Sequence, residues 1–138
     1  MAQINDSDYR AIYQAAADYY GGWYQANVDR IAHSLHPGLA KRAIRKDGTG
    51  KEYLHHLNKE QMLEKTEEGG GSDTPKELQT YQITILDRYE EIAAVKVVAN
   101  EYIDYLHIAK QDGQWLIVNA LWTDNREWKS PGSGQFNA

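Results

Sequence analysis

The spacing of hydrophobic residues changes from helical in the first half of the chain to strand-like in the second half. Between Tyr9 and Trp23 the apolar residues recur every three or four positions, which predicts one long amphipathic helix. Asp6 or Ser7 can serve as its N-cap, and Gly21-Gly22 should weaken its last turn.

Two shorter helices and a hairpin are predicted next. Asn27 can cap a second helix, which ends at His36-Pro37 because a residue before proline avoids helical geometry. Alternating residues on both sides of Asp47-Gly48-Thr49-Gly50 indicate a β-hairpin between Leu39 and Leu57. Asn58 then caps a third helix, which continues to Glu67.

The second half predicts four antiparallel strands, near residues 80–87, 92–100, 102–111 and 114–123. Asp112-Gly113 is a strong two-residue hairpin signal, and counting back from it places Asp104 opposite Leu121. One face of this sheet is then nearly all apolar and should pack against the helices; it holds Ala93, Val95, Val97, Leu106, Ile108, Ile117 and Leu121, with Asp104 and Asn119 as its polar members. The opposite face, with Lys96, Tyr105, His107 and Trp122, suits a subunit interface or solvent.

Length and composition narrow the class of protein. The chain has 138 residues, so we expect one domain at 1–128, followed by a disordered tail at Lys129–Ala138. It has no cysteine, which excludes disulfides and thiolate chemistry. No apolar run is long enough for a membrane helix, and a net charge of −5 disfavours nucleic acid. The N-terminus lacks signal-peptide features, so a cytoplasmic location is expected, with export after signal removal as the alternative.

Asp104 is the strongest candidate for chemistry. On an apolar wall its charged form is disfavoured, so its pKa should be raised and it could act as a general acid or base. Asn119 on the neighbouring strand could hydrogen-bond a ligand carbonyl or hold this carboxylate. The alternative is structural, because buried polar groups usually satisfy one another.

Aromatic side chains of the first helix add to this candidate site. Tyr13, Tyr20 and Trp23 lie on the stripe that should face the sheet, where a packed core would have aliphatic residues. Phenols there favour a cavity whose lining both stacks and hydrogen-bonds. Ordinary core packing, with the hydroxyls reaching the surface, remains the alternative.

Histidines and basic residues give weaker signals. His33 and His36 have a metal-compatible spacing but no third ligand, so we expect no metal, and His36 is placed instead at a pocket rim. A basic stretch surrounds the predicted hairpin: Lys41, Arg42, Arg45, Lys46 and Lys51. A solvated edge hairpin that resists aggregation explains it best, and an anionic ligand or a partner protein is the alternative. Phosphate-binding loops, nucleophile elbows and HExxH motifs are absent.

Three stretches carry a resemblance to a known family. They are residues 17–22 (ADYYGG), residues 31–37 (IAHSLHP) and residues 103–119 (IDYLHIAKQDGQWLIVN). The chain resembles the nuclear transport factor 2-like superfamily and, within it, the putative lumazine-binding family of small bacterial proteins, over about residues 9–122. The resemblance implies a cone-shaped α+β fold, in which a curved antiparallel sheet and three helices enclose a pocket. It also implies a homodimer formed through the outer face of the sheet.

Three functions follow as hypotheses. The first is a non-catalytic domain that binds a small planar or aromatic ligand. In it, the ligand stacks on Tyr13, Tyr20 and Trp23, and its orientation is set by Asp104 and Asn119. The second is a cofactor-independent lyase or isomerase with Asp104 as base and Asn119, His36 or Tyr20 as electrophilic partner. The third is a protein-interaction module. No cofactor is expected in any of them.

Overall fold

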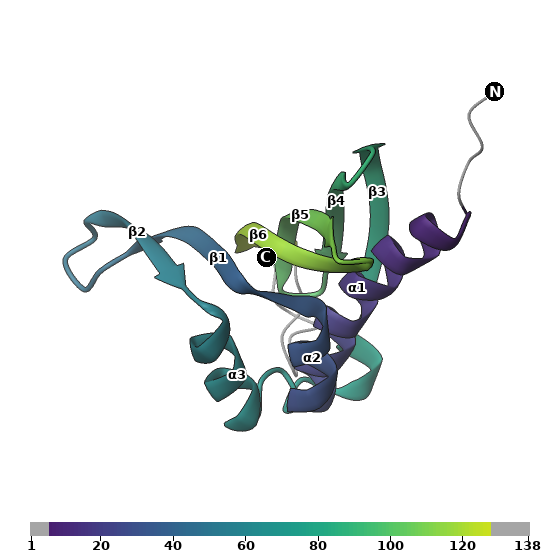
Figure 1. Cartoon of the computed structure of the whole chain (residues 1–138). Coiled ribbons are helices and arrows are strands. Elements are labelled where there is room, and N and C mark those ends of the chain that lie inside the picture. The colour runs from purple at the N-terminus through teal and green to yellow at the C-terminus, as the bar shows by residue number, and fades with distance from the viewer. Residues whose placement is uncertain (1–5, 128–138) are drawn as a thin grey trace.

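The computed structural model describes residues 6–127, and within them three α-helices and six β-strands (Figure 1). The helices are α1 (Asp6–Gln25), α2 (Val28–Ser34) and α3 (Lys59–Glu67), and a short 3-10 helix covers Lys76–Leu78. The strands are β1 (Leu35–Lys46), β2 (Glu52–Leu57), β3 (Tyr81–Tyr89), β4 (Ile92–Ala99), β5 (Tyr102–Gln111) and β6 (Gln114–Asp124). The predicted tail, Lys129–Ala138, lies outside the described residues.

The strands form one curved sheet in the order β2-β1-β6-β5-β4-β3. All neighbouring strands are antiparallel except β1 and β6, which run parallel. The sheet is therefore mixed: the strands after residue 80 are antiparallel, as predicted, and β1 joins β6 in a parallel pair that was not predicted. The α1 helix packs against β6, β3, β4 and β5, and α3 packs against β1 and α2. Figure 1 shows the β1–β2 hairpin extending away from the rest of the sheet, with α3 below it.

Local sequence signals account for the ends of these elements. The Asn27 side chain accepts a hydrogen bond from the Arg30 amide and caps α2, as predicted. Asn58 and Gln61 form a capping box at α3. Asp112 and Gly113 both have positive φ angles, of 52° and 80°, which is the geometry of the predicted two-residue turn.

A β-bulge in β6 changes the predicted register. Ile108 pairs with Ile117 as expected, but His107 pairs with Asn119, so Val118 is an extra residue. Beyond this point the side chains of β6 exchange faces. The prediction that Asn119 and Leu121 face the helices is therefore wrong; Ala120 and Trp122 face inward instead, and Leu121 is exposed.

A buried carboxylate fixes the start of α1 to the sheet. Asp8 accepts hydrogen bonds from the Trp115 indole at 2.9 Å, Lys110 at 3.1 Å and Arg88 at 3.0 Å. The hydrogen bond from Trp115 is the largest of the effects that lower the pKa of Asp8. This contact holds the helix across the sheet at the end opposite to the candidate site.

The glycine pair in α1 has a packing role. The helix continues past Gly21 and Gly22 to Gln25, so these residues do not end it. A Cβ atom at Gly22 would lie 2.8 Å from the Ile31 backbone nitrogen, whereas one at Gly21 would meet the guanidinium of Arg30, which can move. Gly22 thus allows α2 to approach α1 closely.

Gly22→Ala should lower the free energy of unfolding by about 1–3 kcal/mol relative to Gly21→Ala, because the clash with α2 is backbone contact that cannot relax. Both changes gain the same helix propensity, about 1 kcal/mol, so each controls for the other. Urea unfolding followed by circular dichroism measures the difference. Equal stabilities for the two variants would contradict this description of the α1–α2 contact.

Candidate functional site: an aromatic cavity with a buried carboxylate

A cavity of about 310 Å³ lies between α1, α3, the β1–β2 hairpin and the inner side of β5 and β6. Its lining consists of Tyr19, Tyr20, Trp23, Lys41, Arg45, Tyr53, His55, Leu57, Met62, Lys65, Tyr102 and Trp122. Six of these twelve residues are tyrosine or tryptophan, and none is acidic. A concave lining that is mostly aromatic and aliphatic, with a few polar groups, is typical of a small-molecule site.

The aromatic rings hold one another in place. Tyr19 and Tyr20 meet edge to face at 5.2 Å, and Tyr20 stacks on Tyr81 at 5.9 Å. On the other wall, Tyr102 and Trp122 meet edge to face at 5.2 Å. Such contacts fix ring orientations, so the stacking surfaces are preformed.

Asp104 lies directly behind this lining. The residue is 1% exposed, and Tyr20 donates its phenolic hydrogen to Oδ2 at 2.6 Å. Neither Oδ1 of Asp104 nor Nε1 of Trp122 has a hydrogen-bond partner among the described residues. Burial raises the pKa of Asp104, while Lys41 and the Tyr20 hydrogen bond act in the opposite direction. The side chain of Asp104 therefore points into the interior, as predicted.

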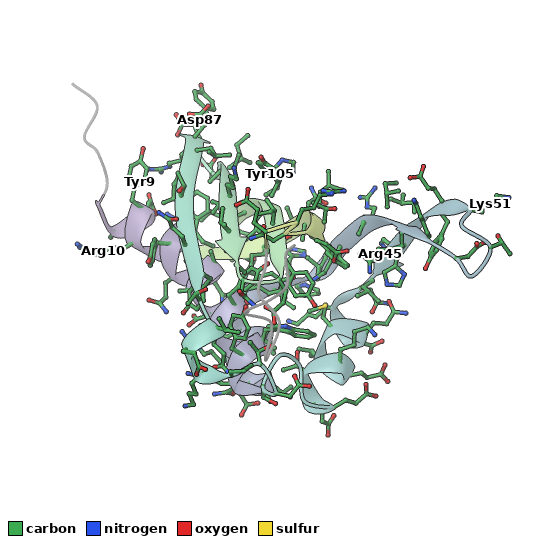
Figure 2. The ribbon with its side chains drawn as sticks, turned by 180° about the vertical axis from the view of Figure 1, so that it is seen from behind. Tyr9, Arg10, Arg45, Lys51, Asp87 and Tyr105 are labelled. Atoms are coloured by element: carbon green, nitrogen blue, oxygen red, sulfur yellow. The ribbon has the colours of Figure 1, made fainter. Side chains whose placement is uncertain are left out.

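Lys41 brings a cation into the same region. Its Nζ donates to the Tyr19 hydroxyl at 2.5 Å and lies 5.1 Å from the centroid of that ring and 5.5 Å from the Trp122 ring. Burial lowers the pKa of Lys41, whereas the nearby Asp104 carboxylate raises it. Arg45 lies 4.9 Å above the Trp122 ring. Figure 2 shows Arg45 on the β1–β2 hairpin. The tryptophan face therefore carries two basic side chains.

The structure brings only some of the predicted site residues together. Tyr20 and Trp23 line the cavity, and Asp104 contacts Tyr20. Tyr13 is half exposed and does not line the cavity. Asn119 bonds to His107 at 3.2 Å on the outer face, because of the bulge.

His36 also lies away from the cavity, and it does not form the predicted pocket rim. Its ring bonds to the Gln111 side chain at 2.7 Å and accepts a hydrogen bond from the Gly38 amide at 2.8 Å. Among the described residues no three His, Asp or Glu side chains gather as a metal site would require.

The sequence analysis did not assign the three basic residues of the lining, Lys41, Arg45 and Lys65, to the site. Lys41 and Arg45 were assigned to a solvated hairpin, yet both face the cavity, on the same side of β1 as the buried Ala43. Strand alternation carried this signal, because positions 41, 43 and 45 share one face. Trp122 could not be placed from the sequence, since the bulge reverses its direction.

Comparison with known families identifies the chain. A family model described as "Putative lumazine-binding" matches residues 7–123. The chain belongs to this family. No curated protein matches it in sequence.

Solved structures agree with this family's fold. An NTF2-like protein of unknown function from Silicibacter pomeroyi has 13% identity, covering 88% of this chain and 100% of that one, with a TM-score of 0.71. One from Methylobacillus flagellatus has 17% identity, covering 89% and 96%, also with a TM-score of 0.71. A ketosteroid isomerase-like protein from Erwinia carotovora atroseptica has 14% identity, covering 83% and 94%, with a TM-score of 0.59. At these identities the likeness shows the fold alone, which is the NTF2-like α+β cone.

This member of the lumazine-binding family also lacks, within residues 6–127, any helix long and apolar enough to span a membrane.

The ionisation of Asp104 is directly testable. We expect a carboxyl ¹³C NMR titration to give Asp104 a pKa above the ordinary aspartate range, and Tyr20→Phe to raise that pKa further by removing a hydrogen bond to the carboxylate. Because the folded pKa exceeds the unfolded one, the contribution of Asp104 to stability is fully present below the unfolded pKa. It is lost as pH rises through the folded pKa.

Tyr13→Phe, on the exposed side of the same helix, is the control and should leave the pKa of Asp104 unaltered. An ordinary pKa that is indifferent to Tyr20→Phe would contradict the described burial and hydrogen bond.

Proposed function

We propose that this protein binds a planar heteroaromatic molecule of the lumazine type in the cavity and does not transform it. The observation that carries the proposal is the aromatic lining. Trp23, Trp122 and the four tyrosines provide flat surfaces on several sides, and a cavity of about 310 Å³ suits a bicyclic ring. The name of the family agrees with such a ligand.

Tyr20 and Asp104 act as a unit in this proposal. The phenol of Tyr20 lines the cavity, and its bond to the buried Asp104 carboxyl fixes its orientation. With its own hydrogen donated to Asp104, the Tyr20 oxygen retains a lone pair that can accept a hydrogen bond from a ring N–H of the ligand. Asp104 is thus a positioning residue, and Tyr20 and Trp23 contact the ligand.

An acid–base enzyme is the second candidate. It is favoured by one observation, the buried Oδ1 of Asp104 with no partner among the described residues, because such groups cluster at catalytic sites. In that case Asp104 would exchange a proton with the substrate of a cofactor-independent lyase or isomerase, and Tyr20 would be the electrophilic partner.

Recovery of an incubated ligand unchanged, checked by mass spectrometry and by proton exchange with deuterated water, supports binding over catalysis.

We further propose that the protein is a homodimer formed through the outer face of the sheet. Tyr105 and Leu121, which pair across β5 and β6, are 47% and 57% exposed there. Figure 2 shows Tyr105 on the side of the sheet away from the helices. Exposed apolar residues side by side on a sheet face are typical of an interface.

Lumazine should bind with a dissociation constant of roughly micromolar or below, measured by isothermal titration calorimetry. His55→Trp should weaken this binding at least roughly tenfold, because His55 lines the cavity and an indole there would fill it. His56→Trp is the matched control: the neighbouring residue is exposed and faces the other way on β2. Equal loss in both variants would contradict the cavity as the site and leave the protein-interaction module.

Light scattering should give a mass of twice 15.8 kDa for the unaltered chain. Tyr105→Glu should shift this toward the monomer, because a charge would be buried in the interface. Tyr13→Glu, a tyrosine of similar exposure on α1, should not. A monomeric unaltered chain would overturn the proposed dimer.

A further inference from the structure

The ionisable groups around the cavity are unlike the chain as a whole. The protein has 20 acidic and 15 basic residues, yet the lining of the cavity contains Lys41, Arg45 and Lys65 and no acidic residue. A concave surface lined by one sign of charge concentrates ions of the opposite sign. The local excess therefore favours an anion in an otherwise acidic protein.

Nearby carboxylates balance this charge only in part. Asp124 lies 3.2 Å from Arg45, but its side chain is 54% exposed, so solvent screens the pair. Asp104 lies behind the lining, and its burial favours the neutral carboxylic acid. Neither acid occupies the space in front of Lys41 and Arg45, which is the cavity itself.

The two basic groups converge on one wall. The Nζ of Lys41 lies 5.5 Å from the centroid of the Trp122 ring, and the guanidinium of Arg45 lies 4.9 Å from it. An aromatic ligand near Trp122 would bring a substituent on its edge within reach of both. Arginine binds carboxylate and phosphate oxygens through two parallel hydrogen bonds, and lysine adds a point charge.

We propose that the ligand is an aromatic acid, whose anionic oxygen group binds between Lys41 and Arg45, with Lys65 at the rim. This inference rests on the proposed function and adds the chemical class of the ligand. A carboxylate and a phosphate monoester share the required chemistry. The cavity volume of about 310 Å³ accommodates a bicyclic ring with one such group.

The test compares four ligands on one ring, by calorimetry at low salt and slightly acidic pH: lumazine, lumazine-6-carboxamide, lumazine-6-carboxylate and the phosphate monoester of 6-hydroxymethyllumazine. At least one of the two anions should bind roughly tenfold or more tightly than both neutral compounds, which corresponds to one charge-assisted contact. Whichever anion binds more tightly identifies the group. The advantage should shrink as salt is added.

Arg45→Gln should remove most of the advantage of the anion over the carboxamide, and Arg42→Gln should retain it. Arg42 is the matched control because it is exposed on the opposite face of the same strand. If lumazine binds but neither anion binds more tightly, this inference fails and the proposed function stands. If none of the four compounds binds, the proposed function itself fails.

Discussion

One extra residue in β6 determines which side chains face the interior of this protein. Val118 interrupts the pairing of β5 and β6, and beyond it Ala120 and Trp122 point toward the helices while Asn119 and Leu121 point away. Without the bulge, the cavity would have an asparagine and a leucine in place of the tryptophan face over which Lys41 and Arg45 lie. Bulges that redirect a side chain are common beside functional sites, and this one forms a wall of the candidate site.

The interior that results violates the usual rules of a protein core. A buried carboxyl oxygen and a buried indole N–H have no partner within the described chain, and a lysine lies beside them with its pKa lowered by burial. Such groups cost stability, and a core built for stability alone would have aliphatic residues there. The rest of the fold offsets this cost through the apolar core around Ile12, Ile31 and Leu106 and through the Asp8 contacts at the far end. Departures of this kind, confined to one cavity, are expected where function sets the side chains.

Most of the fold was predictable from local signals, and the site was predictable only in part. Helix caps, the Asp112-Gly113 turn and the strand order after residue 80 depend on neighbouring residues, so the sequence specifies them. The inward direction of Asp104 was predicted correctly, because β4 and β5 pair without a bulge. The facing directions of Asn119 and Trp122 were predicted the wrong way round, because the extra residue of the bulge has no clear signature in the local sequence. Strand alternation places Lys41 and Arg45 on one face of β1, but which face is inward depends on the parallel pairing with β6, which joins segments far apart in the chain.

We propose that the ligand binds in the cavity between the sheet and the helices, at the end of the molecule where Trp122 lies. The indole N–H signals in a ¹H–¹⁵N spectrum report on this directly during a titration with lumazine. Trp23 and Trp122 line the cavity, whereas Trp115 donates to Asp8 at the opposite end. The structure predicts that the signals of Trp23 and Trp122 shift with saturation while that of Trp115 stays in place. A ligand that binds by calorimetry but shifts Trp115 and leaves Trp122 unmoved would contradict it.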